Sequence, residues 1–295
     1  MISSFSAGFD AIRKRPGLVG LLYLVNLCVA FTLTVPVYIA FNNTVGPSGF
    51  SGDLAHAFDL VLWTDIMEKA GNTMIAMGGQ LLWMIPLYLV WKAAISVGLV
   101  HAIRNGGVRP FWQGVGQFTG RGLLLGLYFL LILLAWTGIT AVGTVVLRML
   151  WDSEAGTFWI FFAILPAIYV TGAALIDLMH DYARIALVVE NKPAGRALLA
   201  GIAWPVRQGV SFALYAAWFF IGTAVLIAPT VSSMTIVGIW GPFLIQQVFL
   251  LLRAAVTVGW FGSEVHFFET RRESPLIAST EADLPLGDVP EIGVA

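Results

Sequence analysis

Apolar residues dominate six long stretches of the chain, and clusters of Gly, Pro, Asn and charged residues separate them. An α-helix needs about 20 mainly apolar residues to cross the hydrocarbon core of a bilayer. The six stretches are approximately 17–41, 73–101, 122–148, 158–181, 208–229 and 236–264. The pattern therefore predicts an all-α, polytopic membrane domain of six transmembrane helices within residues 1–272.

The composition supports this prediction and excludes other classes of protein. Hydrophobic residues make up 58% of the 295 residues and charged residues only 11%, whereas soluble domains carry about 25% charged residues. The net charge of −1 gives no basic surface for nucleic acid. The single cysteine, Cys28, excludes an intramolecular disulfide and a thiolate cluster for zinc.

The distribution of Lys and Arg predicts the orientation. Six spans put both ends of the chain on one side, and the opposite side carries only Lys69 and Arg148 outside the spans. The first side carries Arg13, Lys14, Arg15, Arg104, Arg109, Arg121, Arg184, Lys192, Arg196, Arg207, Arg271 and Arg272. Because basic residues accumulate in cytoplasmic loops, both termini are predicted to be cytoplasmic.

Two segments outside the spans have their own patterns. Residues 53–69 place apolar side chains at mostly helical spacing, with Asp53 suited to cap a helix and Trp63 suited to anchor it at an interface. This predicts a short amphipathic helix on the outer membrane surface, and a disordered loop is the alternative. The tail 273–295 is acidic and interrupted by prolines, which predicts a disordered cytoplasmic segment.

One pattern recurs three times, which predicts an internal repeat. The sequence G-[LV]-x-x-x-L-Y opens the first, third and fifth spans, each time shortly after an arginine. The glycines are Gly17, Gly122 and Gly209, and the arginines are Arg15, Arg121 and Arg207. In the even spans, residues 92–98 match residues 253–259 around paired alanines, and residues 172–175 form a weaker match. The predicted architecture is three tandem helical hairpins, in units of about 5–104, 111–190 and 196–272.

The basic segments before the odd spans and the small residues within the spans predict two kinds of contact. The basic segments mix apolar and basic residues, so they either bind anionic lipid at the inner leaflet or are ordinary cytoplasmic connectors. Their candidate lipid-binding residues are Arg13, Lys14, Arg15, Arg121 and Arg207. Small residues four apart predict close helix packing. These pairs are Gly122 with Gly126, Ala94 with Gly98, and Ala255 with Gly259.

Three charged residues within the spans are the candidates for a functional site, because such charges are costly in a membrane. Lys92 and Arg253 occupy equivalent repeat positions, and Asp177 lies on the fourth span about five residues nearer the cytoplasm. Together they are predicted to line a central polar site for an anionic ligand, such as a lipid headgroup. The alternatives are a fixed ion pair between hairpins, or cations that extend to the interface.

The sequence gives no reason to expect an enzyme, a metal site or a cofactor. His101, His180 and His266 lie near the ends of the even spans without metal-ligand spacing. There is no phosphate-binding loop and no nucleophile elbow. Gln80, Gln246 and Gln247 are candidates for hydrogen bonds between helices.

A cytoplasmic stretch carries a resemblance to known proteins. The residues Ala183-Arg184-Ile185-Ala186-Leu187-Val188-Val189-Glu190, followed by Ala197-Leu198 and Val206-Arg207, resemble a recurrent loop of uncharacterised six-span bacterial inner-membrane proteins. These include the membrane domain found fused to glycerophosphodiester phosphodiesterases. The resemblance implies a bacterial inner membrane and no settled activity. The phosphodiesterase domain is not part of this sequence, so its chemistry is not carried over.

Three functions are compatible with these observations. The first is a non-enzymatic structural or accessory subunit, or scaffold, of a membrane assembly, with the lipid bilayer and other membrane subunits as partners. The second is a transporter or channel for a small anionic or lipidic solute, which internal repeats favour. The repeat unit has an even number of helices, which excludes inverted symmetry. A lipid-processing enzyme is the third, and the missing motifs disfavour it.

Overall fold

The computed structural model describes residues 1–45, 60–61, 64, 68, 71–150, 153–233 and 240–272. The predicted amphipathic segment at 53–69 falls mostly outside these residues, and the predicted disordered tail at 273–295 falls entirely outside them. Neither prediction is therefore tested.

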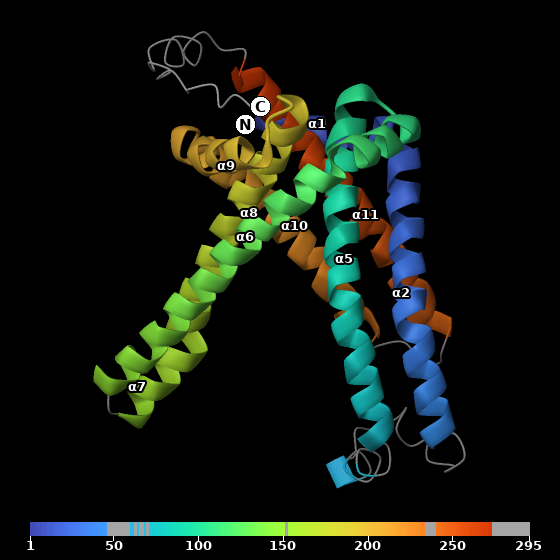
Figure 1. Ribbon diagram of the computed structural model, residues 1–295, viewed down its shortest axis with the longest axis vertical. Helices are drawn as coiled ribbons and strands as arrows, with labels where there is room; N and C mark the ends of the chain where they lie inside the picture. The colour runs from blue at the N-terminus through green and yellow to red at the C-terminus, as the bar shows by residue number, and fades with distance from the viewer. Residues whose placement is uncertain are drawn as a thin grey trace, which may run out of the picture.

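The described residues form helices and short connections, with no strand among them, as the sequence predicts (Figure 1). The main helices are α1 (Ile2–Lys14), α2 (Pro16–Val45), α5 (Gly71–Asn105), α6 (Val108–Leu150), α7 (Glu154–Trp159), α8 (Leu165–Val189), α9 (Ala194–Arg207), α10 (Val210–Ser233) and α11 (Trp240–Arg272). A π-helical turn, η2 (Ile160–Ile164), joins α7 to α8 just before Pro166. Proline donates no backbone hydrogen bond, which fits a change of helix type at this point.

Five stretches of the described helices are long and apolar enough to cross a membrane. They are Leu82–Asn105, Val108–Leu150, Gly156–Val189, Val210–Pro229 and Phe243–Arg272. A sixth crossing is counted if α1 and Pro16–Thr32 of α2, which meet at 77°, are taken together. The prediction of a helical membrane protein is confirmed at this level.

The fourth long helix extends further than its hydropathy predicts. The predicted span ends at residue 181, whereas α8 continues to Val189 and is almost entirely buried from Leu178 onward. Residues 183–189, which the sequence places in a loop, therefore belong to a buried helix. The physical reason is that the charges of Asp181 and Arg184, which resemble the end of a span, pair with one another at 2.8 Å.

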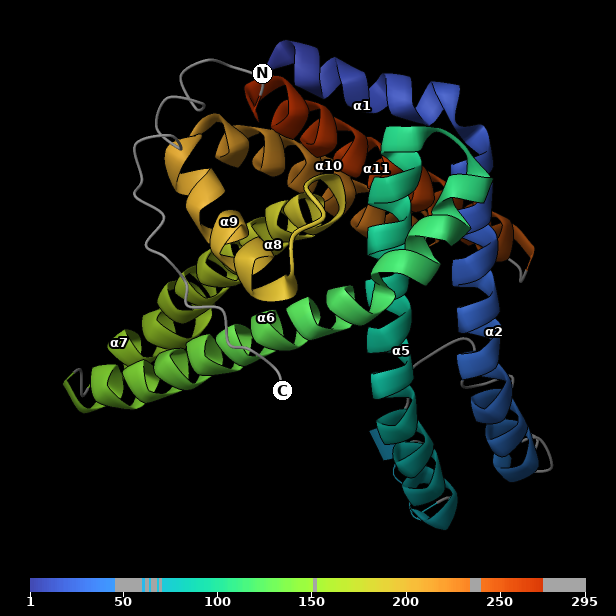
Figure 2. The ribbon, with the colours of Figure 1, turned by 45° about the horizontal axis from the view of Figure 1, so that its top comes forward.

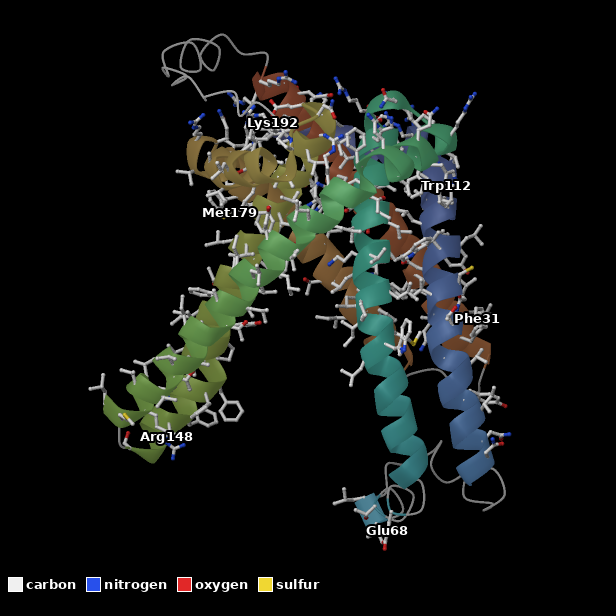
Figure 3. The ribbon with its side chains drawn as sticks, in the orientation of Figure 1. Phe31, Glu68, Trp112, Arg148, Met179 and Lys192 are labelled. Carbon is white, nitrogen blue, oxygen red and sulfur yellow. The ribbon has the colours of Figure 1, made fainter. Side chains whose placement is uncertain are left out.

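The helices converge at one end of the molecule and diverge towards the other (Figures 1 and 2). The core lies at the converged end, where the last turns of α5, α8 and α11 meet the first turns of α2, α6 and α10. Side-chain nitrogen atoms also gather there, around Lys192, while Arg148 lies at the far tip of α6 (Figure 3). We call this the basic end.

Three short amphipathic segments cover the long helices at the basic end, and a glycine lies at each contact. The segments are α1, the first turns of α6, and α9, which pack on α11, α5 and α8 respectively. A Cβ on Gly8 would lie 2.5 Å from the carbonyl oxygen of Gly259, and one on Gly114 would lie 3.2 Å from Cα of Gly98. A Cβ on Gly201 would meet the backbone of α8. Only glycine permits these backbones to approach so closely.

Arginines bind backbone carbonyls at the C-terminal ends of α5 and α8, where a helix has no partners of its own for its last carbonyls. They also place positive charge at the negative end of each helix dipole. Burial lowers the pKa of Arg15, but a guanidinium remains charged in proteins. The contacts are Arg15 with Ile103 O, Arg104 with Val189 O (2.9 Å) and Arg121 with Asn191 O (3.2 Å).

The substitution Gly114→Ala tests the close packing of α6 on α5. Its methyl group would collide with Cβ of His101 at 2.5 Å, so we expect a loss of stability of about 1–3 kcal/mol. Gly116→Ala, on the same helix, meets nothing within 4 Å. We expect it to be neutral or to stabilise by up to about 1 kcal/mol, because alanine favours helix. Thermal unfolding in mild detergent measures both, and equal stabilities would contradict the packing.

Candidate functional site

A cavity of about 460 Å³ lies between α5, α6 and α8, where these helices begin to diverge. Its walls are mainly apolar, formed by Leu89, Val90, Leu123, Leu127, Leu130 and Leu133. Its polar lining residues are Lys92, Ser96, Asp177, His180 and Arg184. The cavity therefore combines apolar walls with a charged region. Its volume is within the range of about 300–1,000 Å³ that is typical of ligand sites.

The polar lining from α8 follows from the spacing of its residues. Asp177, His180, Asp181 and Arg184 lie three or four residues apart, so they share one face of the helix. This face joins the cavity to the core, because Asp177, His180 and Arg184 line the cavity while Asp181 is buried behind them. Such a polar stripe is unusual in a buried membrane helix and is a candidate site by default.

Arg184 is the centre of this stripe. Its side chain is 7% exposed, and it forms an ion pair with Asp181 at 2.8 Å. It also donates to Nδ1 of His180 at 3.2 Å, since a guanidinium can only donate. The guanidinium carbon lies 5.6 Å from the ring centroid of Phe261 on α11. Arg184 is therefore held from several sides, as a charge buried in a membrane protein has to be.

Asp177 and Lys92 are the less constrained charges of the cavity. The side chain of Asp177 is 48% exposed and lies 3.9 Å from Arg184. The hydroxyl of Tyr215, on α10, donates to its Oδ2 at 3.0 Å. Lys92, on α5, is exposed and forms no hydrogen bond or ion pair with any residue that the structure describes. These two groups are the least constrained charges that face the cavity, and so the ones best placed to meet a ligand.

Glu264 adds a buried carboxyl group behind the cavity. It is fully buried on α11, and Oε1 accepts a hydrogen bond from the indole of Trp260 at 2.9 Å. Within the described ranges, it has no cation within ion-pair distance. Buried polar atoms normally have a partner, but several atoms here have none among the described residues. They are Oε2 of Glu264, Nε of Arg184 and the hydroxyl of Tyr182. The core behind the cavity therefore contains more buried polar atoms than its described residues can pair with one another.

The structure brings two of the three predicted intramembrane charges to one cavity. Lys92 and Asp177 both line it, whereas Arg253 is exposed on α11 and does not. Arg184 lines the cavity in place of Arg253. Whether Lys92 and Asp177 bind a ligand stays a prediction.

Arg184, Asp181 and Glu264 are the site residues that sequence reasoning missed. Hydropathy places Asp181 at the end of the fourth predicted span, Arg184 in the cytoplasmic segment that follows it, and Glu264 at the end of the last predicted span. The available signal was the three-residue spacing of Asp181 and Arg184 before a run of five apolar residues, 185–189.

The other predicted residues have varied surroundings. Arg13, Lys14 and Arg207 are exposed at the basic end, whereas Arg15 and Arg121 bind carbonyls. Lipid contacts of all five stay predictions. Among the small residues, Ala94 is buried, Ala255 is partly buried, Gly98, Gly122 and Gly259 lie at close helix contacts, and Gly126 lines the cavity.

The histidines and one glutamine can also be placed. His101 lies near the ring of Phe118, His180 stacks on Phe129, and His266 is exposed. In the described part of the chain, no group of three His, Cys, Asp or Glu residues is arranged to hold a metal ion. Gln247 accepts a hydrogen bond from Tyr23 at 2.9 Å and so joins α11 to α2.

No family model, curated protein or solved structure matches this chain. The function is therefore argued from the site itself.

The double variant Arg184→Met/Asp181→Leu tests the buried ion pair. Arg184→Met alone leaves the carboxylate of Asp181 buried without its cation, and we expect a loss of about 3–5 kcal/mol of stability. The double variant removes both charges, so we expect it to be more stable than Arg184→Met. Arg196→Met, at an exposed position, serves as the control and should change little. Thermal unfolding of purified protein is the measurement, and a double variant less stable than Arg184→Met would refute the pairing.

Proposed function

We propose that this chain is a non-enzymatic membrane protein that takes an amphipathic, lipid-like molecule from the bilayer into the cavity between α5, α6 and α8. The observation that carries the proposal is that one cavity combines apolar walls with Lys92, a cation that has no partner among the residues that the structure describes. An alkyl chain would lie against the leucines of α5 and α6. The polar head would lie beside Lys92 and Asp177.

The position of the cavity supports entry from the side. It lies where α5 diverges from α6 and α8 (Figure 1), and several wall residues are also exposed on the protein surface. Leu89, Val90 and Leu127 are 42%, 44% and 50% exposed. In a membrane these surfaces face lipid, so a lipid chain can enter without crossing a polar barrier. A binding protein or a transporter of lipidic solutes both require such access.

Binding is better supported than catalysis. The strongest candidate for acid–base chemistry, Asp181, is occupied by Arg184 at 2.8 Å, and Glu264 does not line the cavity. A general acid or base has to be within hydrogen-bond reach of the reacting group. The two least constrained charges that line the cavity, Lys92 and Asp177, are suited to hold a ligand.

A threefold repeat of six spans, with both termini in the cytoplasm of a bacterial inner membrane, belongs to the same proposal. Its support is that the three short segments at the basic end, each with a glycine contact, cover α5, α8 and α11 in turn. Two of the three arginines of the repeated motif also bind carbonyls at the end of a long helix. The accumulation of nitrogen atoms at one end (Figure 3) supports the orientation by the positive-inside rule.

Lys92→Met tests the proposed binding site, with Arg253→Met as its matched control. Both variants remove one cation at equivalent positions of the repeat, but only Lys92 lines the cavity. We expect Lys92→Met to lower retention of a diacyl phospholipid about tenfold, the scale of one charge-assisted hydrogen bond. Arg253→Met should retain as much as the unchanged protein. Mass spectrometry of the intact protein from mild detergent counts the bound lipid.

Thermal unfolding of both variants checks that they fold. Equal retention of lipid by the Lys92→Met and Arg253→Met proteins would refute the cavity as the binding site.

A second candidate function, a structural or accessory subunit of a membrane assembly, is favoured by the divergence of the helices (Figure 2). Large side chains on the diverging parts are widely exposed, including Trp83 at 71%, Phe162 at 73% and Met149 at 78%. Either lipid or another protein has to cover them. Other membrane subunits are the partners that this function requires.

Isolation at native expression level in mild detergent tests the second candidate. If the chain is an accessory subunit, mass spectrometry of the intact assembly should find one partner at a fixed ratio in repeated preparations. Recovery of the chain alone, or only with copies of itself, would contradict this function.

A further inference from the structure

The charges around the cavity define the kind of head group that it can hold. Lys92 and Arg184 supply two positive charges, and Asp177 and Asp181 supply two negative charges. The formal charge of this set is zero, and the nearby Glu264 adds no positive charge. A site for a net anion normally presents an excess of cations. The sequence-based expectation of an anionic ligand relied on Arg253, which lies elsewhere.

The free charges are of opposite sign. Arg184 is committed to Asp181 at 2.8 Å and to His180 at 3.2 Å. Lys92 has no described partner. Asp177 accepts a hydrogen bond from Tyr215 and lies 3.9 Å from Arg184, but its side chain is still 48% exposed. A carboxylate accepts about four hydrogen bonds, so one cation and one carboxylate can still bind a ligand, on α5 and α8 respectively. They face the same cavity from different helices.

We propose that the ligand is a lipid with a zwitterionic head group, whose phosphate is held by Lys92 and whose ammonium is held by Asp177. This proposal rests on the proposed function, because it names the head group of the amphipathic molecule in the same cavity. The phosphate accepts hydrogen bonds from the ammonium of Lys92. The ammonium of the lipid donates to the carboxylate of Asp177. The apolar walls hold the acyl chains and give the site its preference for a lipid over a soluble phosphate ester.

Tyr215 orients the carboxylate in this scheme. Its hydroxyl donates to Oδ2 of Asp177 at 3.0 Å, and the other oxygen, Oδ1, is the one nearer Arg184. An asparagine at 177 can still accept from Tyr215 through its amide oxygen. Asp177→Asn therefore removes the charge and keeps the local hydrogen bond. Tyr215→Phe does the reverse, so the two variants separate charge from geometry.

The experiment compares three lipids with identical acyl chains: diacyl phosphoethanolamine, diacyl phosphoglycerol and diacylglycerol. Retention by the purified protein is counted by mass spectrometry in mild detergent. For the unchanged protein we expect the phosphoethanolamine lipid to exceed the phosphoglycerol lipid about tenfold, the scale of one charge-assisted hydrogen bond. Asp177→Asn should abolish that preference, and Tyr215→Phe, which keeps the carboxylate charge but removes its orienting hydrogen bond, should lower it only in part. Soluble phosphoethanolamine should not displace the lipid.

A lipid-side change keeps the proposal falsifiable if Asp177→Asn fails to fold. Acetylation of the amine of the phosphoethanolamine lipid removes its positive charge and leaves its phosphate and chains intact. We expect the unchanged protein to retain this lipid about tenfold less than the parent lipid. Equal retention of the two lipids would overturn the role of Asp177.

The outcomes separate this proposal from the proposed function. Preference for the phosphoglycerol lipid, still dependent on Lys92, would overturn the zwitterionic head group and leave lipid binding in the cavity intact. Retention of all three lipids that is unaffected by Lys92→Met would overturn both. Displacement by soluble phosphoethanolamine would replace the lipid with a small phosphate ester and would also overturn the proposal.

Discussion

Arg184 lies in a helix whose last turns are enclosed on every side, and Asp181 at 2.8 Å makes that position tolerable. A guanidinium in such surroundings without a carboxylate would be strongly destabilising. With it, α8 can extend to Val189 inside the protein, and α5, α6, α9 and α11 can pack around it. The packing of the helices at the converged end therefore depends on the ion pair between Arg184 and Asp181.

The same pair determines what the cavity offers. Because Asp181 neutralises Arg184, the positive charge that reaches the cavity from α8 is already balanced, and Lys92 and Asp177 are left as the least constrained charges that line it. Apolar walls on α5 and α6 continue from the charged region towards the diverging parts of these helices. The burial of Arg184 in the core, which requires Asp181 as its partner, thus determines which charges the neighbouring cavity presents to a ligand.

Hydropathy was sufficient for the helical membrane class, because apolar stretches of spanning length have few alternatives in a bilayer. Hydropathy did not predict where α8 ends, because a charged residue within an apolar run resembles the end of a span unless its ion-pair partner is recognised. Asp181 and Arg184 are three residues apart, and that spacing on a helix was the available signal. Glu264 gave no comparable signal, since its only described hydrogen-bond partner, Trp260, lies four residues earlier and is apolar over most of its surface. Arg253 occupies the repeat position equivalent to Lys92, but the cavity is formed by α5, α6 and α8, whereas Arg253 lies on α11. Equivalence in the repeat therefore could not predict which of the two cations lines the cavity.

The contact between α1 and α11 joins an early segment of the chain to a late one (Figure 2). Of the described helices, α1 is synthesised first and α11 last, so the glycine contact between Gly8 and Gly259 forms only after α11 has been made. Until then the apolar face of α1 can meet Trp218 of α10 but not the surface of α11, and an amphipathic helix that is only partly covered by protein can rest on the membrane surface. Docking of α1 on α11 thus requires that all the described helices between them have already been synthesised.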